Sequence, residues 1–205
     1  DVPRPMHSDF PAYIKHNGFN DIRGGGQFSG RLTAPICFAG AVCAQLLSAR
    51  GIFVGSHLYS VGEEKDCPFD AVKVDDALFL ELRLKPFPII SDEANRRMVQ
   101  RIERARENSD SVGGIVECAV VGLPPGLGDP MFDGIENLLA RALFGIPAVK
   151  GVDFGAGFDA AHMAGSEHND PFEVDSSGSV VTRTNRHGGI LAGITTGMPV
   201  LFRVA

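Results

Sequence analysis

Residues 21–49 read DIRGGGQFSGRLTAPICFAGAVCAQLLSA, a glycine-rich loop that runs directly into a long apolar segment. Thr33 can act as an N-cap, Pro35 falls in the first turn and Gly51 follows the end, so the pattern predicts a helix over 33–49. Because this helix would be apolar nearly all round, we expect it to be buried between layers of structure. The loop before it would then supply main-chain N–H groups at a helix N-terminus, where anions bind readily.

Cationic and titratable side chains are concentrated before this helix. The stretch RPMHSD at residues 4–9 contains Arg4, His7 and Asp9, and Arg23 and Arg31 flank the glycine triplet. Arginine presents a planar fork of donors that can hold a phosphate or carboxylate, and histidine titrates near neutral pH. The stretch therefore predicts an anion pocket with an acid beside it, although a structural or surface loop fits the spacing equally well.

The rest of the chain contains strand-like and helix-like segments. Strands are predicted over 51–61, 112–122, 146–155 and 200–205, where β-branched and other apolar residues are frequent. Helices are predicted over 91–110, which has a serine N-cap and helically spaced apolar residues, and over 131–144. The polar segments 63–76 and 166–179 predict surface loops.

Length and composition limit the class of protein. With 205 residues and 44% hydrophobic content, we expect a single domain over residues 1–205. The sequence starts at Asp1 without a methionine and ends on a strand-like segment, so we expect this domain to be truncated at both ends. A net charge of −6 argues against nucleic acid or an anionic membrane as the partner. Four cysteines without ligand spacing fit free thiols in a reducing cytoplasm, and no metal site is expected. We find no apolar run that approaches the roughly 18 residues of a membrane span, so secretion and membrane insertion are not expected.

Three separated motifs resemble the chorismate synthase family. They are RPMHSD through SGR at 4–31, GLPPGLGDPMFD at 122–133, and AVKGV to NRHGGI across 148–190. The motifs occur in the order and with the separations of that family, so the resemblance extends along essentially the whole chain. The family's N-terminal Gly-Glu-Ser-His-Gly motif and its C-terminal Lys-Pro-Thr and Arg-His-Asp-Pro segments do not occur in this sequence.

The resemblance implies a fold, an assembly and a reaction. The fold is α+β, a β-α-β sandwich with helices packed between antiparallel sheets, and the assembly is a cytoplasmic homotetramer. The reaction is that of a shikimate-pathway lyase, which converts 5-enolpyruvylshikimate 3-phosphate to chorismate and phosphate by anti-1,4-elimination with reduced FMN. NADP would be used only if the enzyme reduces its own flavin.

The resemblance also assigns site residues. Arg4 and Arg31 would bind substrate, and His7 would be catalytic at the leaving phosphate, where negative charge accumulates in the transition state. The FMN contacts would come from Gln27, Phe28, Ser29, Pro147, Ala148 and Ala192. The chain departs from the family where Pro147 replaces an asparagine and where Met6 and Ala192 replace glycines. Proline cannot donate an N–H, so we expect the flavin contacts to be less well preserved than the phosphate-binding residues.

Two other functions fit the same residues. The chain could be a non-catalytic core that acts only in assembly or ligand binding, or a phosphate-binding enzyme of unrelated chemistry built on glycine loops. For Lys150, the sequence suggests either a ligand phosphate or an ion pair with Asp153.

Overall fold

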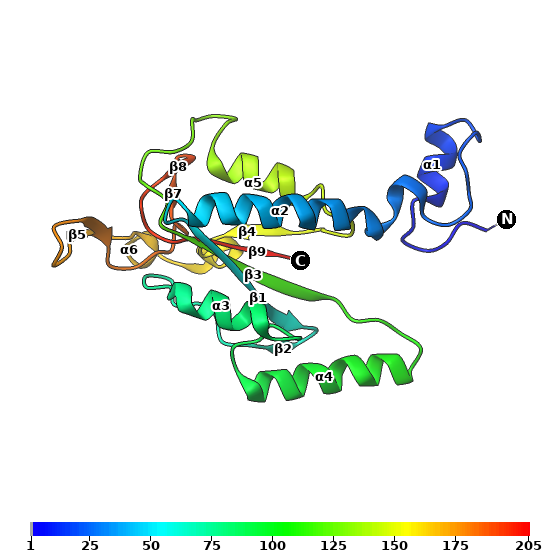
Figure 1. Cartoon of the computed structure of the whole chain (residues 1–205), viewed down its shortest axis with the longest axis horizontal. Coiled ribbons are helices and arrows are strands. Elements are labelled where there is room, and N and C mark those ends of the chain that lie inside the picture. The colour runs from blue at the N-terminus through cyan, green and yellow to red at the C-terminus, as the bar shows by residue number, and fades with distance from the viewer. Residues whose placement is uncertain (1) are drawn as a thin grey trace.

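The computed structural model of the chain describes residues 2–205 and has an α+β fold (Figure 1). Its helices are α1 (Asp9–Lys15), α2 (Thr33–Ser48), α3 (Asp76–Leu84), α4 (Asp92–Glu107), α5 (Ile135–Leu143) and α6 (Gly165–His168). Short 3-10 turns are η1 (Gly26–Phe28), η2 (Gly30–Leu32) and η3 (Gly157–His162). The strands are β1 (Phe53–Val61), β2 (Glu64–Lys65), β3 (Gly114–Val121), β4 (Val152–Phe154), β5 (Phe172–Val174), β6 (Val180–Thr182), β7 (Ile190–Leu191), β8 (Ile194–Thr195) and β9 (Val200–Val204).

The centre of the molecule is a five-stranded antiparallel sheet in the order β2-β1-β3-β9-β4. Strand β3 lies in the middle, and its Cys118 is opposite Ser56 of β1 on one side and Phe202 of β9 on the other. The strands β5–β6 and β7–β8 form two separate hairpins outside this sheet. The sequence predicted β1 from its β-branched and aromatic content with partial alternation and β3 from its near-continuous apolar run, and it predicted β9 as a strand-like terminal segment.

Helices pack on both faces of the sheet. On one face, Val200 and Phe202 form a core with apolar residues of α5 such as Ile135 and Leu139. On the other face, Phe79 and Leu82 of α3 pack against Ala119 of the central strand. Helix α3 approaches β1 closely at Gly55, where an added Cβ would lie 2.0 Å from the Phe79 ring. The side chains of α4 form a third cluster beside β1 through Ala94 and Met98.

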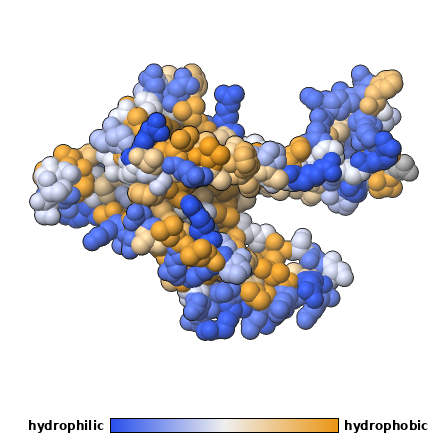
Figure 2. Space-filling view, in the orientation of Figure 1, coloured by the Kyte–Doolittle hydropathy of each residue, from blue (hydrophilic) through white to orange (hydrophobic). Residues whose placement is uncertain are grey.

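The prediction that helix α2 is buried between layers is wrong for the described residues. It covers nearly the predicted residues, but none of its side chains is buried, and Phe38 is 76% exposed. Figure 2 shows hydrophobic residues gathered along this helix at the surface. The described residues contain one large sheet, so the side of α2 that faces away from it has no second layer against it.

The length of this helix also corrects the prediction about membrane spans. With the preceding turn, Gly30–Ser48 forms a 19-residue helical segment of mean hydropathy 1.3, which reaches the length and apolar character of a membrane span. The sequence reading missed it because small residues and glycines interrupt the large apolar ones. By length and composition alone, the core helix of a soluble protein satisfies the same criterion.

Two other expectations are wrong. The polar segment 63–76, predicted as a surface excursion, folds back onto the sheet, and both Asp66 and Phe69 are buried. The segment 166–179, predicted as a loop, contains most of α6 and the first strand, β5, of the β5–β6 hairpin. Helix α3 was not predicted, whereas α4 begins at its expected cap, where the Ser91 hydroxyl accepts a hydrogen bond from the Ala94 N–H at 3.4 Å.

Candidate functional site

The RPMHSD motif folds into a turn that brings its three chemically active side chains together. Arg4 donates to the Asp9 carboxylate through its main-chain N–H at 3.0 Å, through Nε at 2.8 Å and through Nη2 at 2.7 Å. The Nδ1 atom of His7 lies 2.6 Å from Oδ1 of the same carboxylate. Asp9 is the first residue of α1, where a negative charge is favoured by the helix dipole. One carboxylate therefore orients both the arginine and the histidine.

The protonation of this unit follows from its contacts. Hydrogen bonds from the Arg4 side chain hold the pKa of the Asp9 carboxyl well below its usual range, and the same pair raises the pKa of Arg4. Nδ1 of His7 is also 3.2 Å from Nη2 of Arg4, but one ring nitrogen cannot both donate to Asp9 and accept from Arg4. We assign the proton to Nδ1, because the contact with the carboxylate is shorter and charge-assisted. Nε2 is then the ring nitrogen left for a ligand.

Arg31 lies at the entrance to α2. Its main-chain N–H donates to the Ser29 hydroxyl at 3.3 Å, which caps the turn η2, and Thr33 donates to the Gly30 carbonyl at 2.7 Å. No described residue forms an ion pair or hydrogen bond with the Arg31 guanidinium, which is exposed and available to an anion. Three arginines precede α2: Arg4 is paired with Asp9 and Arg23 with Asp21, whereas the Arg31 guanidinium has no partner among the described residues.

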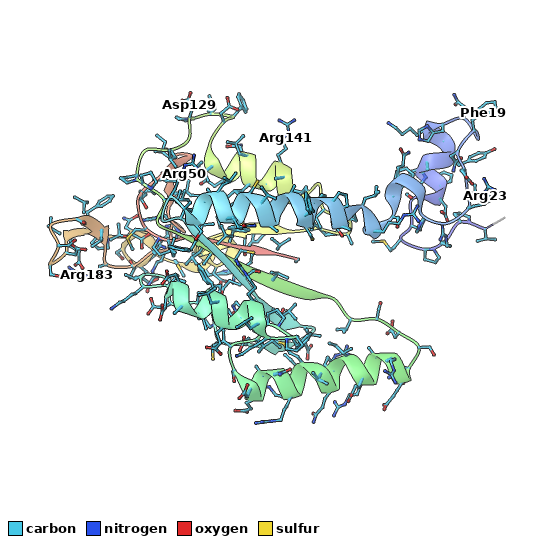
Figure 3. The ribbon with its side chains drawn as sticks, in the orientation of Figure 1. Phe19, Arg23, Arg50, Asp129, Arg141 and Arg183 are labelled. Atoms are coloured by element: carbon cyan, nitrogen blue, oxygen red, sulfur yellow. The ribbon has the colours of Figure 1, made fainter. Side chains whose placement is uncertain are left out.

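The predicted flavin contacts lie in three separate places. Gln27 and Phe28 form the turn η1 beside Ser29, and the Gln27 amide reaches Nε2 of His16 at 3.4 Å. Pro147 and Ala148 follow the C-terminal end of α5, whereas Ala192 lies in the β7–β8 turn, next to the start of that helix. In Figure 3 the labelled Phe19 and Arg23 mark the N-terminal segment at one end of α2, and Arg50 marks the opposite end. The chain brings Arg4 and His7 together but does not gather the flavin positions into one pocket.

Three residues in or beside the predicted site carry a side chain in a left-handed backbone conformation. Met6 has a φ of 54° and Ala192 a φ of 51°, and Ala148 has a φ of 71°. This left-handed region costs a side-chain-bearing residue about 1–2 kcal/mol, whereas glycine enters it freely. Strained conformations of this kind are concentrated at ligand-binding sites. The main-chain N–H groups of Ala148 and Ala192 donate to no described residue, so both could donate to a ligand.

The glycine motif at 122–133 contacts the β7–β8 hairpin, whose turn contains Ala192. Gly126 donates to the Thr195 carbonyl at 2.9 Å, and Thr195 returns a hydrogen bond to the Leu127 carbonyl at 2.9 Å. Gly128 is required by packing, because an added Cβ would lie 2.1 Å from the Gly193 carbonyl oxygen. This motif is therefore structural: it fixes the position of the turn.

Sequence reasoning missed several polar contacts. Asp153 forms a two-point ion pair with Arg203 at 2.9 and 2.7 Å, so the suggested pair with Lys150 is wrong. Asp9 belongs to the RPMHSD motif, but its contacts with Arg4 and His7 were not predicted. Its separations of five and two residues from them, within one turn, are the signal that could have revealed these contacts. Within residues 2–205, no group of three or more His, Cys, Asp or Glu residues is arranged to hold a metal ion.

The fold and the Arg–His–Asp unit together define an α+β protein with an exposed segment, containing Arg4, His7 and Asp9, that leads into a long apolar helix. The family model described as chorismate synthase matches residues 1–205, and the chain belongs to the chorismate synthase family. A crystal structure of chorismate synthase superposes on 96% of the chain with a TM-score of 0.87 at 31% identity, and the chain covers 61% of that structure. This match confirms the predicted fold class.

Curated relatives agree with the family match. The chorismate synthase of Korarchaeum cryptofilum is 49% identical over 203 residues, which is 99% of this chain and 55% of that protein. The chorismate synthase of Thermococcus gammatolerans is 50% identical over 205 residues, again 55% of its length. The chain thus spans about half the length of the curated relatives it matches.

Proposed function

We propose that this chain carries part of the active site of a lyase that converts 5-enolpyruvylshikimate 3-phosphate to chorismate and phosphate by anti-1,4-elimination. The observation that carries the proposal is the Arg4–His7–Asp9 unit, in a chain that belongs to the chorismate synthase family. Loss of phosphate breaks a carbon–oxygen bond and leaves negative charge on the departing oxygen. Arginine donors and a protonated imidazole stabilise that charge, so the residues suit this reaction.

Each residue of the unit has a defined part in the proposal. Arg31, which has no described partner, binds the phosphate, and Arg4, held by Asp9, presents its remaining donors to the substrate. His7 donates a proton from Nε2 to the leaving phosphate, and the Asp9 carboxylate stabilises the imidazolium through Nδ1. Asp9 is therefore a positioning residue in this mechanism: it fixes the ring and its proton.

Reduced FMN is the proposed cofactor, and the chain has groups that fit it in part. The free main-chain N–H groups of Ala148 and Ala192 can donate to a flavin or its phosphate, as can the Ser29 hydroxyl, with Gln27 and Phe28 beside it. Pro147 has no N–H and can contribute only its ring or carbonyl oxygen. When bound, reduced FMN would supply electron density transiently to the substrate and assist removal of the ring proton.

We also propose that the protein works as a cytoplasmic homotetramer. Two observations support assembly: α2 is apolar and exposed, and the flavin positions are spread over three places in one chain. NADP would take part only if the protein reduces its own flavin. The spread of these positions also favours the second candidate function, in which this stretch acts only as an assembly or ligand-binding core.

The two functions are distinguished by turnover of the protein that contains this chain. Under anaerobic conditions with reduced FMN and 5-enolpyruvylshikimate 3-phosphate, formation of chorismate is followed by its absorbance. His7→Ala is expected to lower kcat by about 10²-fold or more. His162→Ala removes an exposed histidine elsewhere in the chain and should leave kcat unchanged. Absence of product from the unsubstituted protein, or full activity of the His7→Ala variant, would reject the proposed catalytic role.

A further inference from the structure

A cavity of about 490 Å³ lies on the face of the central sheet opposite α5. It is bounded by β1, β3 and β9 together with residues 68–72, 155–156 and 184–186. None of the residues assigned above to substrate or flavin lines it. Its volume falls within the range of small-molecule sites, and its lining is mainly apolar with a few polar groups, which is the usual composition of such sites.

A buried carboxylate faces this cavity with one oxygen unused. Glu117 of β3 is 8% exposed, and its Oε2 accepts hydrogen bonds from Nε2 of His57 at 2.9 Å and from the Phe69 N–H at 2.7 Å. Its other oxygen, Oε1, accepts from none of the described residues, although Glu117 lines the cavity. His57 is itself fixed by Asp66, which lies 3.0 Å from Nδ1. The carboxylate is therefore rigidly placed and can accept further donors.

The same cavity holds a cation without a carboxylate partner. The guanidinium of Arg186 reaches the Met163 sulfur at 3.3 Å, and no described residue forms an ion pair with it. Its main chain is fixed because the Arg186 N–H donates to Asp170 at 3.0 Å. Arg203 also lines the cavity, but Asp153 occupies its guanidinium in a two-point ion pair. Arg186 is thus the arginine that is free to bind a ligand anion here.

The rest of the cavity lining consists of an apolar floor and a second carboxylate. Phe69 and Leu201 form an apolar floor, and both side chains belong to the core under α3. A second carboxylate, Asp70, is exposed and accepts hydrogen bonds from the Val72 and Lys73 N–H groups, which cap its own turn. Glu117 and Arg186 do not pair with each other, so each has capacity for a ligand group of opposite charge.

We propose that this cavity binds a free apolar α-amino acid, with its ammonium group on Glu117, its carboxylate on Arg186 and its side chain on the floor formed by Phe69 and Leu201. An amino acid carries both charges on one carbon beside an apolar group, which matches the three features of the cavity. The proposal does not depend on the lyase function. Its energetic basis is that a buried acceptor and a free guanidinium gain hydrogen bonds that the unliganded protein lacks.

The test compares three probes with the same aromatic body. L-Phenylalanine carries both charges, phenethylamine lacks the carboxylate, and 3-phenylpropanoate lacks the ammonium group. Binding is measured by NMR chemical-shift titration and by calorimetry. We expect L-phenylalanine to bind at least about tenfold more tightly than either analogue, and amide shifts to be concentrated at the cavity.

Two matched variants locate the site. Arg186→Gln should weaken L-phenylalanine to the affinity of phenethylamine, while phenethylamine itself changes little. Arg183→Gln removes an exposed arginine that pairs with Glu173 and does not line the cavity, and it should change no affinity. Equal binding of the three probes, no saturable binding in the millimolar range, or unchanged L-phenylalanine binding by the Arg186→Gln variant would overturn the proposal.

Discussion

Replacing Asp66 by asparagine should destabilise the protein strongly, because this carboxylate joins three parts of the fold. The Asp66 side chain is fully buried, and its oxygens accept from His57 Nδ1 at 3.0 Å, Ile90 N–H at 2.6 Å and Ser91 N–H at 2.9 Å. An asparagine of the same shape keeps one oxygen and turns an N–H group toward at least one of these donors. It also removes the charge that faces the buried imidazole. Disrupting such a buried pair costs about 3–5 kcal/mol, so we expect about 3 kcal/mol and a Tm lower by roughly 6–12 °C.

The assay is equilibrium unfolding in urea, followed by circular dichroism. A lower midpoint with an unchanged slope would show a loss of stability without a change in the surface exposed on unfolding. Asp70→Asn is the matched control, because Asp70 is exposed and caps its own turn, and it should cost less than about 1 kcal/mol. If the Asp66→Asn variant unfolds within about 1 kcal/mol of the parent, the hydrogen-bond argument is wrong.

Three further predictions concern the site and the thiols. Asp9→Asn should lower kcat/KM by about tenfold to a hundredfold and change the ¹⁵N shifts of the His7 ring, because Nδ1 loses its carboxylate partner. Unchanged His7 shifts would contradict this. Ala192→Gly should raise the free energy of unfolding by about 0.5–1 kcal/mol in a urea titration, because the left-handed backbone no longer carries a side chain. Burial raises the pKa of the Cys118 thiol to about 12, so it should stay unmodified by a disulfide reagent at pH 8 while Cys67, which is exposed and lies outside α2, reacts. Equal rates for the two thiols, read by mass spectrometry, would refute that assignment.

The elements that the sequence predicted correctly are those with strong local signals. Helix α4 has a serine cap and an amphipathic repeat, and its apolar Ala94 and Met98 are both buried as that repeat requires. The prediction for the segment around Asp66 was wrong because the polar composition of this segment resembles that of a surface loop. Its burial depends on partners that are distant in sequence, such as Glu117, which accepts from the Phe69 N–H. Local composition cannot reveal a polar group that is satisfied by a residue on another strand.

In the candidate site too, the sequence revealed the residues that lie close together in the chain and not those that only the fold brings together. Arg4, His7 and Asp9 lie within six residues, and a single turn brings them together, so a local motif was sufficient to find two of the three. The positions assigned to flavin are placed by resemblance alone, and the chain leaves them at opposite ends of α5 and at the start of α2. The cavity lined by Glu117 and Arg186 could not be predicted from the sequence. Its lining residues are far apart in the chain, and only the folded sheet brings their strands and loops together.

Helix α2 links the fold to the proposed assembly. A helix that is apolar nearly all round is stable where every side of it is covered, and the described residues leave Phe38 76% and Leu46 56% exposed. Lipid or protein can provide such cover, but the curated relatives of this chain are nearly twice as long, which favours protein. Arg31 lies in the turn η2, which leads directly into this helix, and Ser29 caps that turn. Whatever covers α2 therefore also fixes the orientation of the proposed phosphate-binding arginine, so the assembly and the active site should form together.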